Sequence, residues 1–586
     1  MSILKSFKNV FSAWWRPVLA IFIPLALLPL IIANDNTESR CGFVVAWMAF
    51  YFMFEPVPLA VTALLPVATF PVLGVLSTGE ACTPYMKDTI MMYVGSLTLA
   101  VAVEHCNLHK RIALKVLLLI GTGARWLMLG FMTTTMFLSM WISNTATTAM
   151  MVPIVDAVLD ELEKEDKIHH KNDSISLITI PSSMSSSIWS SESNKNHYQI
   201  NMQLSNISSS SQRKDYGRLR DSLLLSIAYA ANCGGTGTVI GSGPNLVLKG
   251  LMEELYPEST ELTFASWLMY NAPTMIICVI ICWLALQLCY KPCGSSDDST
   301  QLAARNAVLK SYRELGPINF HEGAVATLFL LVVFLWFSRD PKFVDGWSTY
   351  LAKGSNIRDA TPVIGVCLLL FIIPSKPSLH QRSRPLLEWR VAQKKIPWGV
   401  LLLLGSGFVV ADAAKKSHLS VWLSSQLSYL NYFSPAVICV LLTLMASALT
   451  EVISNMSMAT IMLPVVSEMA EAVKVHPLFF MLPVTIGCSF AMILPVGNPS
   501  NAIVFEASNM KTFDMLKPGL ISKVLCCAVE LFMIQTLGVA IFNLNTFPDW
   551  ANNTHIMSED NSTIGWTTLQ NSTAAANLNF TSLQYG

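Results

Sequence analysis

Two stretches of this sequence are versions of one pattern: residues 137–153 read FLSMWISNTATTAMMVP, and residues 448–464 read ALTEVISNMSMATIMLP. In each stretch a Ser-Asn pair interrupts an apolar run, and a proline follows ten residues after the serine. Serine and asparagine are preferred N-cap residues, so each pair can end one half-helix and begin the next. The pattern therefore predicts two matched helix breaks.

The rest of the chain has the composition of a membrane protein. Of its 586 residues 53% are apolar and only 13% are charged, whereas soluble domains carry about 25% charged residues. The 38 basic and 38 acidic residues cancel, which removes the electrostatic case for nucleic-acid binding. The cysteines form no C-x-x-C pair, so we expect small apolar filler, not a disulfide framework or a zinc site.

Long apolar runs predict the membrane spans. A hydrocarbon core about 30 Å thick needs about 20 apolar residues per helix. About 11 runs qualify: 17–33, 42–54, 57–76, 89–106, 223–250, 266–290, 322–338, 359–374, 397–414, 477–505 and 519–543.

Two further apolar regions, about 126–158 and about 433–472, are too long for one span and contain the Ser-Asn pairs. Polar irregular backbone is tolerated at membrane depth only where protein or a water-filled cavity covers it. We therefore predict two re-entrant hairpins; the alternative is a single kinked span with a surface-facing asparagine.

The basic residues predict the orientation. With a cytoplasmic N-terminus, most Lys and Arg clusters fall inside, as the positive-inside rule requires. An odd number of spans then places the C-terminus outside, at the plasma membrane. The tail, 546–586, supports this because it contains four N-x-Ser/Thr sequons, which predict glycosylation of Asn552, Asn561, Asn571 and Asn579. A Ser-rich stretch, about 163–221, is expected to be a disordered cytoplasmic loop.

An internal repeat organises the chain. A Gly-Ser pair precedes each hairpin, Gly95-Ser96 and Gly405-Ser406, and an interrupted helix follows it. Those interruptions predict broken helices over 223–250 and 477–508. Residues 1–40 then hold the N-terminus and first span, 41–290 the first repeat, 291–321 a cytoplasmic linker and 322–545 the second repeat. Five spans separate matching elements, so the repeat is inverted, as in many secondary transporters.

The chemistry at the breaks suits ions. Helix N-termini favour anions, while hydroxyls, amide oxygens and free carbonyls are hard ligands for a small cation such as sodium. No Lys or Arg lies at either break, so an anion would need a co-bound cation. The acids Glu55, Glu104, Asp412 and Glu451 lie in or beside apolar runs. Intramembrane carboxylates suggest function, and Glu451 can organise the second hairpin; for the others the alternative is a helix-end carboxylate near water or a locally paired one.

These motifs resemble the divalent anion/sodium symporter family, the sodium-coupled di- and tricarboxylate and sulfate cotransporters. The resemblance rests on residues 137–145, 234–245, 450–455 and 488–501. It implies an all-α homodimer in which a transport domain carries substrate past a scaffold by an elevator motion.

The resemblance also implies the sites. The first sodium ion would be bound by Ser139, Ser143, Asn144 and Gly241, and the second by Thr450, Ile453, Asn455 and Gly497. The anion would be bound by Asn144, Thr145, Ser242, Asn455, Met456 and Pro499.

Within the family, the substrate signals point in two directions. Residues 241–245 resemble the carboxylate branch, residues 496–499 resemble the sulfate branch, and Met456 fits neither. We predict a sodium-coupled importer of di- and tricarboxylates such as succinate and citrate. The alternatives are a sodium-coupled sulfate transporter and a sodium-independent carboxylate exchanger. Motifs of membrane-embedded enzymes and a P-loop are lacking, so we predict neither an enzyme nor an organic cofactor.

Overall fold

The computed structural model describes residues 2–120, 124–176, 217–290, 298–341, 345–351, 357–377, 383–427, 432–508 and 510–552. Within these ranges the chain is helical and has no β-strand; Pro374 and Pro385 form an isolated bridge. In the same ranges seven helical stretches are long and apolar enough to cross a bilayer, and four shorter apolar helices accompany them. The chain is thus a multi-pass all-α membrane protein, and the count of about 11 spans stays a prediction.

The helices of the first part of the chain are α1 (Ser2–Leu27), α2 (Pro29–Ala33), α3 (Thr37–Phe54), α4 (Leu59–Thr62), α5 (Leu65–Val72), α6 (Thr78–Cys82), η1 (Thr83–Met86), α7 (Asp88–His105), α8 (Leu108–Ile120), α9 (Ala124–Ser139), α10 (Asn144–Ser176), a helix over 217–234, α12 (Gly243–Leu255) and α13 (Phe264–Tyr290).

Those of the second part are α14 (Asp298–Glu314), α15 (Phe320–Arg339), η2 (Trp347–Tyr350), α16 (Ala360–Ile372), α17 (Trp389–Lys395), α18 (Trp398–Lys416), α19 (Leu419–Leu427), α20 (Pro435–Leu449), α21 (Asn455–Val473), α22 (Pro477–Ser489), η5 (Pro495–Gly497), α23 (Pro499–Ala507), α24 (Thr512–Met533), the π-helix η6 (Ile534–Gly538), α25 (Val539–Phe542) and α26 (Asp549–Asn552).

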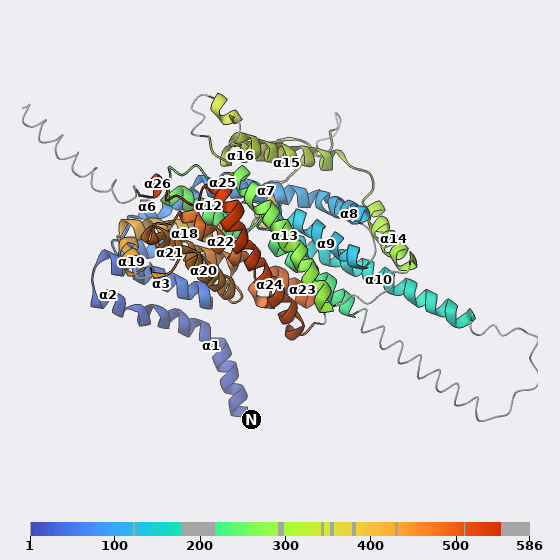
Figure 1. Cartoon of the computed structure of the whole chain (residues 1–586), viewed down its shortest axis with the longest axis horizontal. Coiled ribbons are helices and arrows are strands. Elements are labelled where there is room, and N and C mark those ends of the chain that lie inside the picture. Colours follow the sequence, from blue (N-terminus) through green and yellow to red (C-terminus); the bar gives the residue numbers. More distant parts are fainter. Residues whose placement is uncertain are drawn as a thin grey trace, which may run out of the picture.

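The repeat is visible in how the helices pack. Helices α9 and α10 correspond to α20 and α21, the broken pair 217–234 and α12 corresponds to α22 and α23, and α13 corresponds to α24. The contacts between the halves are reciprocal, since α10 packs on α23 while α21 packs on α12. The paired helices α13 and α24 run side by side through the middle of the molecule (Figure 1).

The helix breaks fall at the Ser-Asn pairs. Helix α9 ends at Ser139 and α10 begins at Asn144; α20 ends at Leu449 and α21 begins at Asn455. The first turn after each break starts in the same way, because the carbonyls of Ser143 and Ser454 accept from amides four residues later at 3.0 and 2.9 Å. Both serines therefore stand at the N-cap position, although the side chain of Ser143 accepts from the Ala146 amide at 3.4 Å and that of Ser454 makes no cap hydrogen bond.

The stretch predicted to be disordered and the predicted linker both contain helix. Helix α10 continues to Ser176 and the next helix begins at 217, so both ends of the predicted Ser-rich loop are helical; 177–216 lie outside the described residues. The predicted linker, 291–321, contains α14, which packs on α8 and α10. Low hydropathy does not distinguish an unstructured segment from a surface helix, because surface helices are polar too.

Close helix contacts use small residues. A Cβ atom on Gly95 would lie 2.8 Å from Val363, and one on Gly405 would lie 2.3 Å from the Tyr85 ring. These glycines thus let α7 approach α16, and α18 approach η1, as small residues do in membrane helix packing. By contrast, α1 extends away from the body of the molecule (Figure 1), and its apolar side chains from Trp14 onward are largely exposed.

Candidate functional site

A cavity of about 600 Å³ lies where the four helix breaks meet. The N-termini of α10, α12, α21 and α23 all contribute to its wall. Its lining includes Ser143, Asn144, Thr145, Gly241, Ser242, Gly243, Ser454, Asn455, Met456, Gly497, Asn498 and Pro499. Four helix N-termini around one cavity supply unpaired amides and partial positive charge, which is an environment for an anion.

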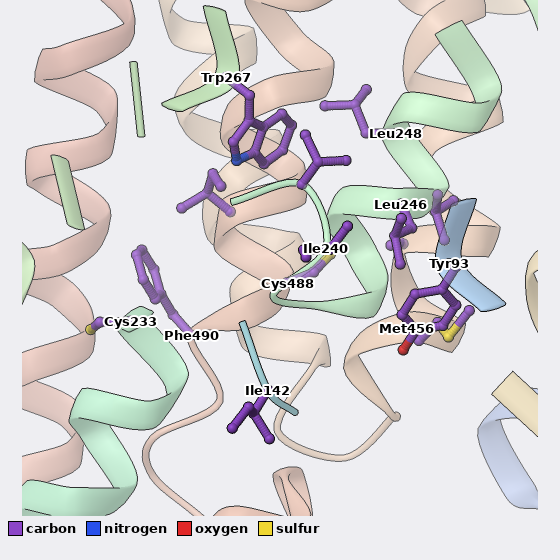
Figure 2. Close-up of a cluster of buried hydrophobic side chains, with 14 of the residues drawn as sticks. Tyr93, Ile142, Cys233, Ile240, Leu246, Leu248, Trp267, Met456, Cys488 and Phe490 are labelled. Atoms are coloured by element: carbon purple, nitrogen blue, oxygen red, sulfur yellow. The ribbon is translucent and has the colours of Figure 1, made fainter. Parts of the chain in front are cut away.

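Apolar side chains from both halves complete the wall. Tyr93, Ile240 and Met456 line the cavity, and Figure 2 shows them as part of a larger apolar cluster with Leu246, Cys488 and Phe490. The sulfur of Met456 would be 3.0 Å from a Cβ on Gly243, so its side chain packs against the start of α12. A cavity with few polar groups on an apolar wall is typical of small-molecule sites.

The first half holds a cluster of oxygen atoms behind the cavity. The buried hydroxyl of Ser139 lies 2.7 Å from Asn144 Oδ1 and 2.9 Å from the Ala231 carbonyl. A Cβ on Gly235 would lie only 2.5 Å from Asn144 Oδ1. Glycine at 235 is therefore needed for the Asn144 amide to occupy this position.

The second half repeats this cluster. The buried hydroxyl of Thr450 lies 2.8 Å from Asn455 Oδ1 and 2.8 Å from the Cys488 carbonyl. Thr450 stands where Ser139 stands in the first half, five residues before its asparagine. Each half thus offers a hydroxyl, an amide oxygen and a carbonyl within hydrogen-bonding distance, which are the neutral hard ligands that an alkali-metal ion takes.

The broken helices are held by equivalent asparagines. The Asn245 amide donates to the carbonyls of Gly235 and Thr238 at 2.9 and 2.8 Å. The Asn501 amide donates to the carbonyls of Ala491 and Leu494 at 2.9 and 3.1 Å. These bonds satisfy backbone groups that the break removes from the helical ladder.

Asn498 belongs to the segment that resembles the sulfate branch, and its side chain forms hydrogen bonds within the protein. Its Nδ2 donates to Asn232 Oδ1 at 2.7 Å, and its Oδ1 accepts from the Ser500 amide at 3.2 Å. The side chain therefore caps α23 and joins the two halves.

Glu451 ties the second hairpin to its broken helix. Its carboxylate accepts from the backbone amides of Met492, Ile493 and Leu494 at 2.9 to 3.2 Å. Lys523 of α24 lies 2.6 Å from Glu451 Oε1, and both side chains are 7% exposed. The hypothesis that Glu451 organises this hairpin agrees with these contacts, which a charge-assisted network makes strong.

The remaining acids behave differently. Glu55 is exposed at the end of α3. Glu104 lies 2.6 Å from Lys395, and Asp412 lies 3.1 Å from Lys416. Local pairing near water describes Glu104 and Asp412, whereas Glu55 is an exposed helix-end carboxylate that also lines the cavity.

The predicted residues fall into two layers. All six predicted anion contacts line the cavity: Asn144, Thr145, Ser242, Asn455, Met456 and Pro499. Of the predicted sodium ligands, Ser143, Gly241 and Gly497 line it too, while Ser139, Thr450 and Ile453 are buried behind it. Of the four sequons, Asn552 ends α26, and Asn561, Asn571 and Asn579 lie outside the described residues.

The sequence motifs did not single out several cavity-lining or buried polar residues. Trp15 and Arg16 of α1 line the cavity, which no local motif signals. Lys523 and Glu530 lie in one of the predicted spans, 519–543, and a scan for charges inside that span would have found them. The thiols of Cys233, Cys282 and Cys526 lie within 4.8 Å of one another and are fully buried; none of them lines the cavity.

Comparison with known proteins assigns the chain. A family model described as the sodium:sulfate symporter transmembrane region matches residues 12–544. The chain belongs to this family. Relatives in the sodium:sulfate symporter family include the Na(+)/citrate cotransporter of Rattus norvegicus, 40% identical over 95% of this chain and 100% of the relative.

Other relatives extend this group. The Na(+)/dicarboxylate cotransporter 3 of Homo sapiens is 38% identical over 93% of this chain and 95% of the relative. Solute carrier family 13 member 2 of Homo sapiens is 37% identical over 91% of this chain and 94% of the relative. Among solved structures, the efflux pump MtrF of Neisseria gonorrhoeae has a TM-score of 0.50 at 11% identity, covering 80% of this chain and 85% of MtrF; at this identity the likeness concerns the fold alone.

Proposed function

We propose that the protein is a sodium-coupled symporter that imports di- and tricarboxylates across the plasma membrane. The observation that carries this proposal is the cavity enclosed by the N-termini of α10, α12, α21 and α23. It offers amides and helix dipoles to a multiply charged anion; the charged side chains among its lining residues are Arg16 and Glu55, whose formal charges cancel. Relatives that match nearly the full chain carry names of sodium/citrate and sodium/dicarboxylate cotransporters.

Sodium supplies the charge that the helix breaks lack. The first ion would bind Ser139, Ser143, Asn144 and the Gly241 carbonyl; the second would bind Thr450, the Ile453 carbonyl, Asn455 and the Gly497 carbonyl. The contacts of Asn144 with Ser139 and of Asn455 with Thr450 support these sets. Because both asparagines also line the cavity, cation and anion would share them, so binding of sodium would prepare the site for the anion.

Three observations favour a carboxylate over sulfate. The cavity, about 600 Å³, falls in the range of about 300–1,000 Å³ for small organic ligands. Its apolar wall of Tyr93, Ile240 and Met456 matches a carbon backbone between charged ends. The polar atoms of Asn498 form hydrogen bonds with Asn232 and Ser500, so this residue is a weaker indication of sulfate binding.

The movement would be of the elevator type. The broken helices and hairpins form one packed unit around the cavity, and this unit would carry the bound anion past a scaffold in a homodimer. The N-terminus would be cytoplasmic and the C-terminus extracellular, with the sequons at Asn552, Asn561, Asn571 and Asn579 glycosylated. No organic cofactor and no chemical conversion are part of this proposal.

The direct test is uptake of labelled citrate, succinate and sulfate by cells that express the protein, in sodium medium and in choline medium. Sodium-dependent, saturable carboxylate uptake is expected. Sulfate uptake would make the protein a sulfate transporter, and carboxylate flux without sodium would make it an exchanger; either result contradicts the proposal.

A further inference from the structure

Helix α24 carries a carboxylate in the interior of the membrane-embedded region. Glu530 is 0% exposed and lies twelve residues before Phe542, the end of the candidate span Thr512–Phe542. At 1.5 Å per residue this is roughly 18 Å along the helix. An ionised carboxylate at such depth is costly unless a cation or several hydrogen bonds compensate it.

The contacts of Glu530 provide little compensation. The Tyr270 hydroxyl of α13 donates to Glu530 Oε1 at 2.7 Å. The other oxygen, Oε2, is buried and has no hydrogen-bond partner among the described residues. One neutral donor does not offset a full buried charge.

The titratable groups around Glu530 include no cation in the part of the chain that the structure describes. Those close enough to interact with it are Tyr270 and Cys278 of α13, Cys439 of α20, and Cys527 of α24 itself. Helix α22, which also packs on α24, has Cys488 as its one titratable side chain, and α25 has none.

The lysine on the same helix is already paired. Lys523 lies seven residues before Glu530, roughly 10 Å along the helix, and its ammonium group contacts Glu451. Helix α13, which faces α24, contains no charged residue. Glu530 therefore lacks a protein counter-charge within the described ranges.

The backbone is also irregular beside this residue. The Glu530 carbonyl accepts from the amide of Ile534, and from Ile534 to Gly538 the chain forms a π-helix. Such turns are rare and occur frequently at functional sites. Tyr270 packs beside the same turn, since a Cβ on Gly538 would lie 3.3 Å from its ring.

A proton neutralises this carboxylate better than sodium does. A sodium ion needs several oxygen ligands, whereas the titratable neighbours here are one tyrosine hydroxyl and three thiols, and thiols prefer soft metals. A single proton on Oε2 removes the charge and needs no further ligand. We propose that Glu530 is a proton-binding site of the carrier, distinct from the two sodium sites, and that its neutral form is required for the packing of α13 on α24. This inference rests on the proposed transport function.

The test is the pH profile of succinate uptake, from about pH 7 to about pH 9, where the carboxylates of the substrate are ionised. Wild-type uptake should fall several-fold as pH rises. Neutral Glu530 stabilises the packing of α13 on α24 at low pH, and this stabilisation is lost as the carboxyl group loses its proton. Glu530→Gln, a neutral isostere, should transport with a flat profile. Tyr270→Phe removes the donor that favours the anion, so its decline should move to higher pH.

Controls separate the possible failures. Glu258→Gln, at an exposed position between α12 and α13, should keep the wild-type profile. If Glu530→Gln fails to reach the surface, Glu530→Met supplies a second neutral variant. Identical pH profiles for wild type and both variants would overturn the proposal. The proposal would also fail if Glu530→Gln lost sodium cooperativity but kept its pH response, because Glu530 would then belong to a sodium site.

A readout that does not depend on transport tests the proton site at Glu530 separately from the proposed transport function. The midpoint of thermal unfolding of the purified protein should decline with rising pH in wild type and stay level in Glu530→Gln. If wild type shows no uptake but this difference is present, the proposed function fails and the proton site stands. Parallel unfolding profiles in both proteins contradict the proton site even if transport is present.

Discussion

The two hairpins share their geometry and differ in their electrostatics. In the first, Met140 stands three residues before the Ser-Asn pair, and its carbonyl accepts from the Thr238 hydroxyl. In the second, Glu451 stands at that place, holds three backbone amides of the broken helix and pairs with Lys523. One fold thus accommodates either neutral hydrogen bonds or a buried ion pair at equivalent places.

The difference shows which parts of the repeat are constrained. The hydroxyl-asparagine contacts, Ser139 with Asn144 and Thr450 with Asn455, differ by only 0.1 Å between halves. Their surroundings diverge, since Thr145 is matched by Met456 and Gly235 by Ala491. We infer that both halves keep the chemistry of cation binding, while the anion meets a polar wall on one side and a more apolar wall on the other.

The largest expected effect comes from removing the shared asparagines. Asn144→Ala and Asn455→Ala should each reduce sodium-dependent uptake at least about a hundredfold, or about 2.7 kcal/mol of transition-state free energy. Each amide is proposed to bind a sodium ion and the anion. The measurement is initial-rate uptake normalised to surface protein.

An asparagine far from the tips provides the matched control for these two variants. Asn306 is exposed on α14 and lies outside the cavity lining, so Asn306→Ala should transport normally. Near-normal uptake in either tip variant contradicts the site assignment. Loss in one variant alone would show that the halves are not equivalent.

The ion pair of the second half should matter for stability. Lys523→Met or Glu451→Gln leaves the charge of the other residue buried without its partner, which should lower the free energy of unfolding by about 3–5 kcal/mol. The double variant Glu451→Gln/Lys523→Met is neutral at this place, as the first half is, and should lose less stability than the two single changes added together. Thermal unfolding of the purified protein measures all three.

In the first half, Met140 stands at the place of Glu451, so Met140→Leu is the matched control. It should lower the free energy of unfolding by less than about 1.5 kcal/mol. Additive losses in the double variant would show that Glu451 and Lys523 do not stabilise each other.

The Gly235–Ala491 difference predicts a change in sodium affinity. Gly235→Ala should raise the sodium concentration for half-maximal uptake about tenfold, or about 1.4 kcal/mol, because the added methyl group would displace Asn144 Oδ1. Ala491→Gly in the second half should change it little. Equal sodium affinity in wild type and Gly235→Ala would mean that Asn144 Oδ1 is not a sodium ligand.

Met456→Thr makes the second tip resemble the first and should have the smallest effect. It should change the ratio of citrate to succinate uptake about threefold to tenfold, since a hydroxyl replaces an apolar wall, while sodium dependence stays the same. Competition between the two labelled substrates measures the ratio. An unchanged ratio would exclude position 456 from contact with the anion.

The sequence predicted the helix breaks because their signals are local. Ser-Asn caps, glycine and proline act within one turn, and their spacing located the tips of both hairpins and both broken helices. The anion residues were named from the family resemblance, which rests on the same motifs that form the four helix N-termini lining the cavity.

Contacts between distant segments could not be predicted in this way. Lys523 reaches Glu451 across 72 positions, and Tyr270 reaches Glu530 across 260; nothing in the local pattern of either segment specifies its partner. The helical ends of the Ser-rich stretch were missed for another reason, because hydropathy alone does not separate a polar surface helix from a disordered chain.

The central claim is that each half binds one sodium ion beside a shared anion. The most direct measurement is the sodium activation curve of succinate uptake for wild type, Ser139→Ala and Thr450→Val. We predict a sigmoidal curve for wild type and a shift to higher sodium concentration in both variants, since each loses one hydroxyl ligand. A hyperbolic wild-type curve, unchanged in both variants, would contradict the two-site account.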